Sequence, residues 1–217
     1  MESWKKILPD YEFMLWDKQR FDINSVAWVK EAYEAKKYAF AADYIRQYAV
    51  YTMGGIYMDM DVEAVKPFGE LLDKPYMLGS EVELRIEAGI FGAEAGCELM
   101  RWCMDFYENN HFLLTDGTLN MQGAPNVMNE CITKHRKLQI ANDHGADSEI
   151  VYLYPYDVLT AKSGDTGVVK KTKRTRTIHH FAGSWLKPSK RHQIKVFIAR
   201  LLGDSLTRRL SNMIMSR

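Results

Sequence analysis

Two aspartates, Asp59 and Asp61, stand in a segment whose pattern suits the binding of a divalent cation. The run from Ile56 to Val62 alternates apolar and polar residues, so a strand there would place both aspartates on one face. Two carboxylates this close destabilise each other unless a cation neutralises them. Mg²⁺ and Mn²⁺ favour oxygen ligands and commonly bridge carboxylates to substrate phosphates. The pair therefore predicts a metal site that faces a phosphorylated substrate.

The context of the pair is more informative than the pair itself. A chain with 14 aspartates in 217 residues contains about one Asp-x-Asp by chance, and a solvated strand end would explain an isolated one. Here a helical pattern over Ala39–Met53 is followed by Gly54-Gly55, which ends a helix as a glycine after the last turn does. The strand that carries the aspartates then begins at once.

The elements that must position this pair alternate between strand and helix patterns. Interleaving of this kind indicates an α/β fold with a largely parallel sheet and one core. Apolar periodicity predicts strands at Tyr11–Trp16, Ile56–Val62, Tyr76–Ser80, Ile86–Phe91, Ile150–Tyr154 and Thr177–Phe181, and helices at Asn24–Lys36, Ala39–Met53, Cys97–Asn109, Asn126–Lys137 and Lys190–Leu202.

Composition and charge exclude several other classes of protein. With 47% apolar residues, the chain can bury a substantial core, which excludes disordered, collagen-like and coiled-coil proteins. Its 29 Lys and Arg balance 28 Asp and Glu, which argues against a nucleic-acid partner. Residues 186–217 nevertheless hold eight Lys and Arg against one Asp. A mildly acidic body with a basic tail is typical of a protein that works near an anionic surface.

Cysteine spacing and hydropathy predict a cytoplasmic protein. Cys97, Cys103 and Cys131 show no C-x-x-C spacing, which excludes a zinc finger and a thioredoxin-like site, and we expect reduced thiols. The N-terminal run lacks the apolar stretch of a secretory signal, and no window of 18 apolar residues occurs. Peripheral contact with the inner face of the cytoplasmic membrane is an alternative that the basic tail leaves open.

Two basic segments each have two interpretations. Lys162–Arg176 is either a solvated loop or a rim that faces phosphates. We divide the chain into a domain at 1–186 and a tail at 187–217. The tail is predicted to contain a basic amphipathic helix, which either packs on the domain or lies on an anionic membrane through residues 190–217. The apolar positions of this helix are Ile194, Phe197, Ile198, Leu201 and Leu202.

Residues 39–62 resemble the core signature of the DXD-containing glycosyltransferases of family 32, which include bacterial capsular-polysaccharide transferases and fungal initiating mannosyltransferases. The family pattern is a D-x-x-R helix followed by G-G-I-Y-x-D-x-D, matched here by Asp43, Arg46 and the run from Gly54 to Asp61. Tyr154-Pro155 and the run Thr177–Trp185 are similar to the family's closing H-x-x-x-S-W element. Three motifs in the same order, over most of residues 1–186, make this likeness far more specific than the carboxylate pair.

The resemblance implies a GT-A-type, Rossmann-like fold that binds a nucleotide-sugar through Mn²⁺ or Mg²⁺. The metal would neutralise charge on the departing nucleotide. A hexose or N-acetylhexosamine would move from a UDP- or GDP-sugar to a glycan or lipid-linked glycan acceptor in capsule or lipopolysaccharide assembly, with retention. The implied catalytic residues are Asp59, Asp61 and Arg46. The implied donor-binding residues are Asp43, Arg46, Gly55, Tyr57, Asp59, Gly89, Asn126, Ser184 and Trp185. Gly89 and Asn126 are included because the segments Ile86–Gly92 and Gly123–Asn126 are similar to segments of the family.

A histidine would complete the metal site with Asp59 and Asp61, since imidazole suits Mn²⁺ alongside carboxylates. His179 and His180 face opposite sides of a strand, so only one can join the cluster. We favour His180, which directly precedes the Phe-Ala-Gly-Ser-Trp run. By the resemblance, Ser184 and Trp185 belong to a loop that folds over the donor diphosphate and excludes water.

The resemblance also implies that the usual first strand is lacking. Relatives begin with an I-P-K-I-I-H-x-x-W-type strand before the segment that matches Glu2–Asp10, whereas this chain starts at Met1, inside the helix that would follow. Ala42 also stands where many relatives have serine. Two other functions stay open: a non-catalytic relative that binds a nucleotide-sugar or glycan, and a haloacid-dehalogenase-like phosphatase, whose nucleophile motif is also a strand that ends in D-x-D.

Overall fold

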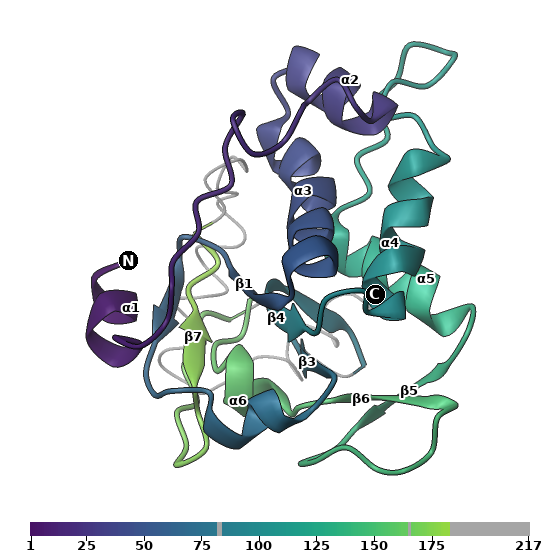
Figure 1. Cartoon of the computed structure of the whole chain (residues 1–217). Helices are drawn as coiled ribbons and strands as arrows, with labels where there is room; N and C mark the ends of the chain where they lie inside the picture. The colour runs from purple at the N-terminus through teal and green to yellow at the C-terminus, as the bar shows by residue number, and fades with distance from the viewer. Residues whose placement is uncertain (82–83, 165, 183–217) are drawn as a thin grey trace, which may run out of the picture.

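The structure is a computed structural model that describes residues 1–81, 84–164 and 166–182 of the chain (Figure 1). Ser184, Trp185, the boundary near residue 186 and the predicted tail helix lie outside the described residues. The described elements are α1 (Glu2–Ile7), α2 (Ala27–Glu34), α3 (Tyr38–Met53), β1 (Gly55–Met58), β2 (Val62–Ala64), the 3₁₀ helix η1 (Gly69–Asp73), β3 (Tyr76–Ser80), β4 (Ile86–Ala93), α4 (Glu98–Glu108), α5 (Ala124–Thr133), β5 (Lys137–Ile140), β6 (Ile150–Leu153), α6 (Tyr156–Leu159) and β7 (Thr177–His179).

A three-stranded sheet with the order β1-β4-β3 lies at the centre of the described chain, and both of its pairs are antiparallel. β2 pairs with β7 in antiparallel orientation, and β5 pairs with β6 in parallel orientation. The mixed α/β prediction is confirmed, but the largely parallel sheet is wrong for the described strands. Only the five residues 81–85 separate β3 from β4, and so short a connection permits only a hairpin, because a parallel crossover needs a dozen residues or more.

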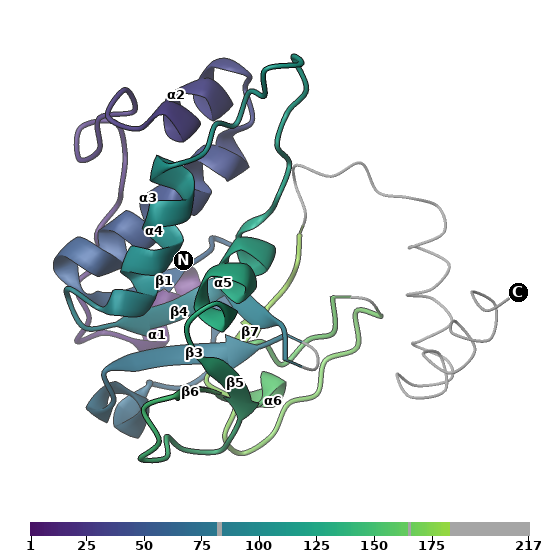
Figure 2. The same ribbon diagram turned by 90° about the vertical axis from the view of Figure 1, so that its right-hand side faces the viewer.

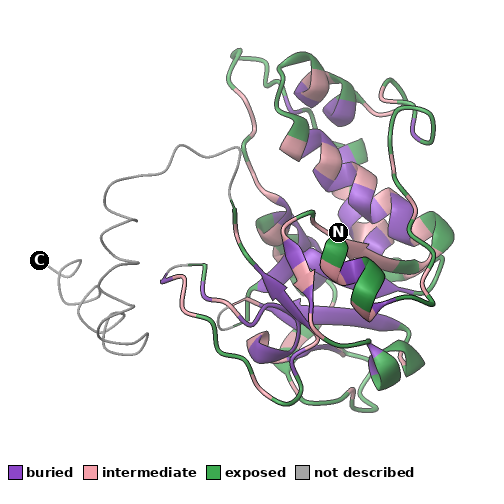
Figure 3. Cartoon of the chain, turned by 90° about the vertical axis from the view of Figure 1, so that its left-hand side faces the viewer, coloured by how far each residue is buried: buried purple, intermediate pink, exposed green. Residues whose placement is uncertain are grey.

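Both faces of this sheet are covered (Figures 1 and 2). On one face, Leu78 and Phe91 pack in a core with residues of α2, α3, α4 and α5. On the opposite face, Met77 and Ile90 pack with residues of α1, β2, η1 and α6. Every residue of β3 and β4 is therefore buried, as Figure 3 shows.

The end of α3 confirms the predicted glycine stop. Gly54 has a φ of +68°, and its N–H donates to the Val50 carbonyl at 2.9 Å. A Cβ at this position would lie 2.9 Å from the backbone nitrogen of Ala95. Both the left-handed conformation and the close approach require glycine. The chain therefore passes from α3 directly into β1, the strand that precedes the aspartates.

The predicted strand at Tyr11–Trp16 is wrong, because no described strand pairs with this segment. Aromatic contacts hold this segment against the rest of the protein instead. Phe13 stacks on Trp4, and Tyr11 packs edge-on against Phe68. Trp16 packs edge-on against Tyr48. The apolar residues here thus mark a segment held by aromatic contacts, not a hydrogen-bonded ladder. Among the described helices, none is both long and apolar enough to cross a membrane.

Asp157 of α6 anchors the segment that leads into β7. Its carboxylate accepts hydrogen bonds from Arg174 at 2.7 and 2.8 Å and from the Thr172 hydroxyl at 2.9 Å. Its carbonyl accepts a bond from the Thr175 hydroxyl at 2.7 Å. Burial opposes ionisation, but the bonds from Arg174 and Thr172 outweigh it and lower the pKa of Asp157.

We expect Asp157→Asn to reduce the free energy of unfolding by about 2 kcal/mol at pH 7, because charge-assisted hydrogen bonds are lost. The folded-state pKa lies below the unfolded value of about 3.9, so the stabilisation is present above that value and is lost as the pH falls further. Urea titrations of wild type and variant at pH 7 and pH 3 measure this. The difference between them should shrink at pH 3, and an equal difference at both would contradict the assignment.

Candidate functional site

The two aspartates stand in the turn that carries the chain from β1 into β2. The Val62 N–H donates to the Asp59 carbonyl at 2.9 Å, which closes the turn around Met60 and Asp61. The Asp59 N–H donates to the carbonyl of Gly89 in β4 at 2.7 Å. The position of the turn is thereby tied to the central sheet.

This turn replaces the continuous strand that we predicted over Ile56–Val62. β1 pairs with β4 in the central sheet, whereas β2 pairs with β7 in a different sheet, so the chain must change direction between them. Met60, which a continuous strand would place on the same face as Met58 and the buried Val62, is 67% exposed. The aspartates come together because of the turn and not because of strand alternation.

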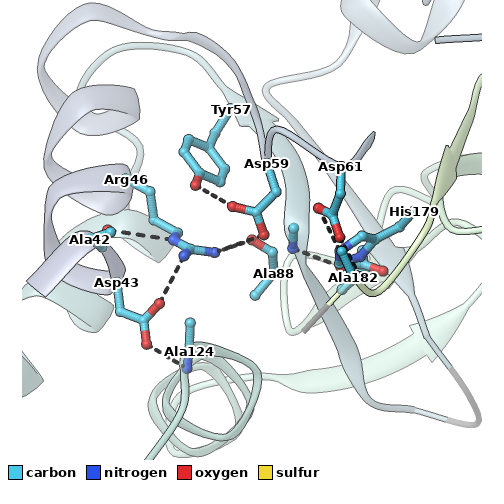
Figure 4. A network of polar contacts seen from close by, with 12 residues as sticks. Ala42, Asp43, Arg46, Tyr57, Asp59, Asp61, Ala88, Ala124, His179 and Ala182 are labelled. Carbon is cyan, nitrogen blue, oxygen red and sulfur yellow. Dashed lines mark hydrogen bonds and ion pairs between the residues drawn. The ribbon is translucent and has the colours of Figure 1, made fainter. Parts of the chain in front are cut away.

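Asp59, Asp61 and His179 form a cluster of candidate metal ligands (Figure 4). One ligand atom of each residue lies within 4.8 Å of those of the other two. The Nε2 atom of His179 is 3.4 Å from Oδ1 of Asp61. The second oxygen of Asp61 accepts the Ala182 N–H at 2.7 Å, which fixes the orientation of the carboxylate.

The histidine in this cluster is His179, not His180, which the sequence analysis favoured. His180 is exposed, and its Nε2 lies 2.9 Å from an oxygen of Glu63. The two rings do face different surroundings, as strand alternation requires. Which of them meets the aspartates depends on the register of β7 against β2, where His179 stands opposite Val62. Local sequence does not encode that register.

Residues 87–89 of β4 lie directly beside His179, at a point where the register of β4 against β3 shifts. The Gly89 N–H donates to Oε1 of Glu87 at 2.6 Å, and the same oxygen lies 3.0 Å from Nδ1 of His179. Phe181 stacks on the imidazole with 4.0 Å between ring centroids. A Cβ at position 89 would lie only 2.7 Å from Nδ1 of His179. Glycine therefore leaves the space that the imidazole fills.

Arg46 and Asp43, one turn apart on α3, join the cluster through Asp59 (Figure 4). Nη2 of Arg46 lies 2.9 Å from Asp43, while Nη1 donates to the Ala88 carbonyl at 2.9 Å and lies 3.6 Å from Asp59. Asp59 also accepts a short hydrogen bond from the Tyr57 hydroxyl. Both members of the α3 pair are buried, so they form part of the site's interior.

These contacts shift pKa values in directions that keep Asp61 ionised. The hydrogen bond with His179 lowers the pKa of Asp61 to about 2, against the opposing effect of burial. Burial alone would lower the pKa of His179, but its bonds with Asp61 and Glu87 outweigh burial and raise that pKa to about 10. Burial raises the pKa of Asp43 to about 6, although Arg46 opposes the shift. A cation is thus favoured beside Asp61, and the imidazolium of His179 supplies it here.

The donor set of the cluster fits a divalent metal ion. Two carboxylates and one imidazole suit Mn²⁺, while Mg²⁺ has a stronger preference for oxygen ligands. A ligating imidazole must be neutral, so binding of an ion would release the proton from Nε2 of His179. The bound ion would then replace the imidazolium as the positive charge beside Asp59 and Asp61.

Two of the predicted donor residues lie apart from this cluster. Gly55 begins β1 and is exposed, about 13 Å of extended chain before Asp59. Asn126 is exposed in the first turn of α5, although that helix is tied to the site because its Ala124 N–H donates to Asp43 at 3.1 Å. Roles for Gly55 and Asn126 stay predictions.

Sequence reasoning missed Glu87, which contacts His179. It used the surrounding segment Ile86–Gly92 only for the weak resemblance that suggested Gly89. A signal was nevertheless present, since Glu87 is an acidic residue within an otherwise apolar strand. A carboxyl group in such a position must either reach solvent or find a partner inside the protein.

Comparison with known proteins supports the sugar-transfer prediction. Residues 1–78 match a family model described as "Glycosyltransferase sugar-binding region containing DXD motif". Inositol phosphoceramide mannosyltransferase 3 of Schizosaccharomyces pombe (strain 972 / ATCC 24843) is 29% identical over 112 residues, which cover 48% of this chain and 32% of that protein. The matched region thus spans about a third of the length of this curated relative. Both matches are to glycosyltransferases and support the prediction that the chain is an enzyme of this class.

We expect Gly89→Ala to weaken Mn²⁺ binding at least about tenfold, because the added Cβ displaces the imidazole of His179. The signal of free Mn²⁺ in electron paramagnetic resonance measures the affinity. Gly123→Ala is the matched control, since a Cβ there meets only a Pro125 atom at 3.9 Å and the backbone is extended. Equal Mn²⁺ affinity of wild type and folded Gly89→Ala would contradict the geometry described here.

Proposed function

We propose that the chain is a metal-dependent glycosyltransferase that moves a hexose or N-acetylhexosamine from a UDP- or GDP-sugar to a surface-glycan acceptor. The cluster of Asp59, Asp61 and His179 carries this proposal, since its two aspartates form the D-x-D of the segment that matches the glycosyltransferase family model. A GT-A-type arrangement of the fold is part of the proposal. The turn of the aspartates at the end of β1, beside a sheet covered on both faces, is consistent with it.

In this proposal Asp59, Asp61 and His179 hold Mn²⁺ or Mg²⁺. When bound, the ion would supply positive charge to stabilise the departing nucleoside diphosphate. Neighbouring residues hold the two carboxylates in place. Ala182 and His179 orient Asp61, while Tyr57 and Arg46 orient Asp59. Because these contacts exist before any ligand arrives, little reorganisation is needed when the donor binds.

The role of Arg46 follows from its contacts. Its guanidinium engages Asp43, Asp59 and the Ala88 carbonyl at the same time, so we assign it first the orientation of the two carboxylates. Asp43 would accept hydrogen bonds from donor sugar hydroxyls, and Arg46 would compensate its charge in the buried setting. Closure of Ser184 and Trp185 over the diphosphate belongs to the same proposal.

The acceptor and the stereochemistry are further parts of this proposal. Retention would have the acceptor hydroxyl attack on the face that the nucleotide leaves. A capsule or lipopolysaccharide glycan, free or lipid-linked, would be the acceptor, and the basic segment 190–217 would supply contact with an anionic membrane. The matched relative is named a mannosyltransferase that acts on inositol phosphoceramide, so GDP-mannose belongs in any donor panel.

We expect Asp61→Ala to reduce nucleotide release from the cognate donor by at least about 100-fold, because the diphosphate loses its charge stabilisation. The assay measures release from a panel of UDP- and GDP-sugars with Mn²⁺, with Mg²⁺ and with a chelator, with and without glycan acceptors. Asp10→Asn, an exposed aspartate outside the site, is the control and should retain full activity.

This assay, together with measurements of donor binding and of phosphate release from simple phosphomonoesters, separates the alternatives. Metal-dependent release from one donor, lost in Asp61→Ala, would support the transferase. Donor binding without release or transfer would instead favour a non-catalytic relative. Phosphate release from simple phosphomonoesters, without any nucleotide release, would favour the phosphatase.

We expect Arg46→Lys to reduce kcat/KM for the donor by about 10- to 100-fold, because an ammonium group cannot engage three acceptors in the planar geometry of a guanidinium. Steady-state kinetics with the cognate donor measures this. Arg101→Lys on α4 makes the same change at an exposed pair with Asp105 and should leave kcat/KM unaltered. Full activity of Arg46→Lys would show that charge alone suffices at this position.

A further inference from the structure

Glu87 is a fully buried acidic residue whose contacts aim at the proposed metal site. Its exposed fraction is 0%, and it lies inside the apolar strand β4. Oε1 accepts the Gly89 N–H at 2.6 Å and lies 3.0 Å from Nδ1 of His179. Among the described residues, Oε2 has no hydrogen-bond partner. A buried carboxyl group is costly unless hydrogen-bonded, so the contact with His179 is its principal compensation.

The oxygen that Gly89 and His179 share favours a proton on one particular nitrogen of His179. Oε1 of Glu87 accepts the Gly89 N–H and lies within hydrogen-bond distance of Nδ1 of His179, so a proton on Nδ1 gives the carboxyl oxygen two donors at once. A neutral imidazole then has its lone pair on Nε2. That atom is the one that lies 3.4 Å from Asp61.

Two further contacts fix the plane of the ring, and the bond to Glu87 then selects between its two orientations in that plane. Phe181 stacks on the imidazole, and the missing Cβ of Gly89 leaves a space that the imidazole edge occupies. A ring flip would place a carbon beside Oε1 of Glu87 and lose the hydrogen bond. Glu87, Gly89 and Phe181 therefore hold one orientation of His179, in which Nε2 faces the two aspartates.

We propose that Glu87 is the positioning residue of the metal site: it holds the Nδ1–H of His179 and thereby presents Nε2 to a divalent cation at Asp59 and Asp61. The proposal rests on the proposed function, because it assigns His179 as a metal ligand. Outer carboxylates of this kind fix the tautomer of a ligating histidine, and their loss typically weakens metal affinity about 10- to 100-fold.

Mn²⁺ binding to three glutamate variants tests this without any substrate. Glu87→Met keeps the volume but removes the acceptor, Glu87→Gln keeps an acceptor oxygen, and Glu63→Gln alters the exposed partner of His180 as the matched control. Electron paramagnetic resonance gives the Mn²⁺ affinity, and electron spin echo modulation reports nitrogen bound to Mn²⁺. Circular dichroism verifies that each variant is folded.

We expect Glu87→Met to bind Mn²⁺ about 10- to 100-fold more weakly and to lose the nitrogen modulation. Glu87→Gln should retain the modulation, and Glu63→Gln should match wild type. Wild-type affinity and modulation in Glu87→Met would overturn the proposal while leaving the transferase intact. Absence of Mn²⁺ binding by the wild type would overturn the metal-dependent function as well.

A tautomer measurement on the wild-type protein provides a second test that no folding defect can obscure. In Zn²⁺-saturated, ¹⁵N-histidine-labelled protein, nitrogen NMR with His179→Asn for assignment should show His179 protonated at Nδ1 and bound to Zn²⁺ through Nε2, since Zn²⁺ accepts imidazole and carboxylate ligands. Protonation at Nε2, or an unligated His179, would overturn the proposal.

Discussion

Three consecutive residues of β4 contact His179, Arg46 and Asp59, which come from three different segments of the candidate site. Glu87 bonds the His179 ring, the Ala88 carbonyl accepts Arg46, and the Gly89 carbonyl accepts the N–H of Asp59. The register shift of β4 against β3 in this segment frees these groups from the regular ladder. Elements as distant in sequence as α3 and β7 are therefore placed relative to one another by one short irregular stretch of strand.

Charge compensation is the second constraint on the site. Asp43, Asp59, Asp61 and Glu87 bring acidic groups into a small region, and only Arg46 and His179 among the residues described above supply positive charge there. The raised pKa of His179 expresses this imbalance, because its neighbours favour the imidazolium. Opposite charge beside the carboxylates is therefore favoured, and either the imidazolium of His179 or a bound divalent ion can supply it.

The success of sequence reasoning varied with the range of the interaction involved. The D-x-D pair, the Asp43–Arg46 spacing and the Gly54 stop are local patterns, and the structure places the two aspartates of the D-x-D and the Asp43–Arg46 pair in one network. His180 was favoured over His179 because alternation shows only that the two differ, while the choice depends on the pairing of β7 with β2. The prediction of a strand at Tyr11–Trp16 was wrong for a related reason, since a strand requires a neighbouring strand to pair with, and no local pattern specifies one.

The sequence by itself determined the chemistry available to this protein: two carboxylates two residues apart, an acid–base pair on the preceding helix and a histidine pair near the end of the described chain. These features depend on residue type and on spacing within a few positions, which the periodicity of a helix or strand makes readable. Only the tertiary structure decided that His179 meets the aspartates, that the D-x-D segment turns after Met58 and that Glu87 holds the imidazole. These outcomes depend on strand register and on a bulge, which arise from contacts between segments far apart in the chain.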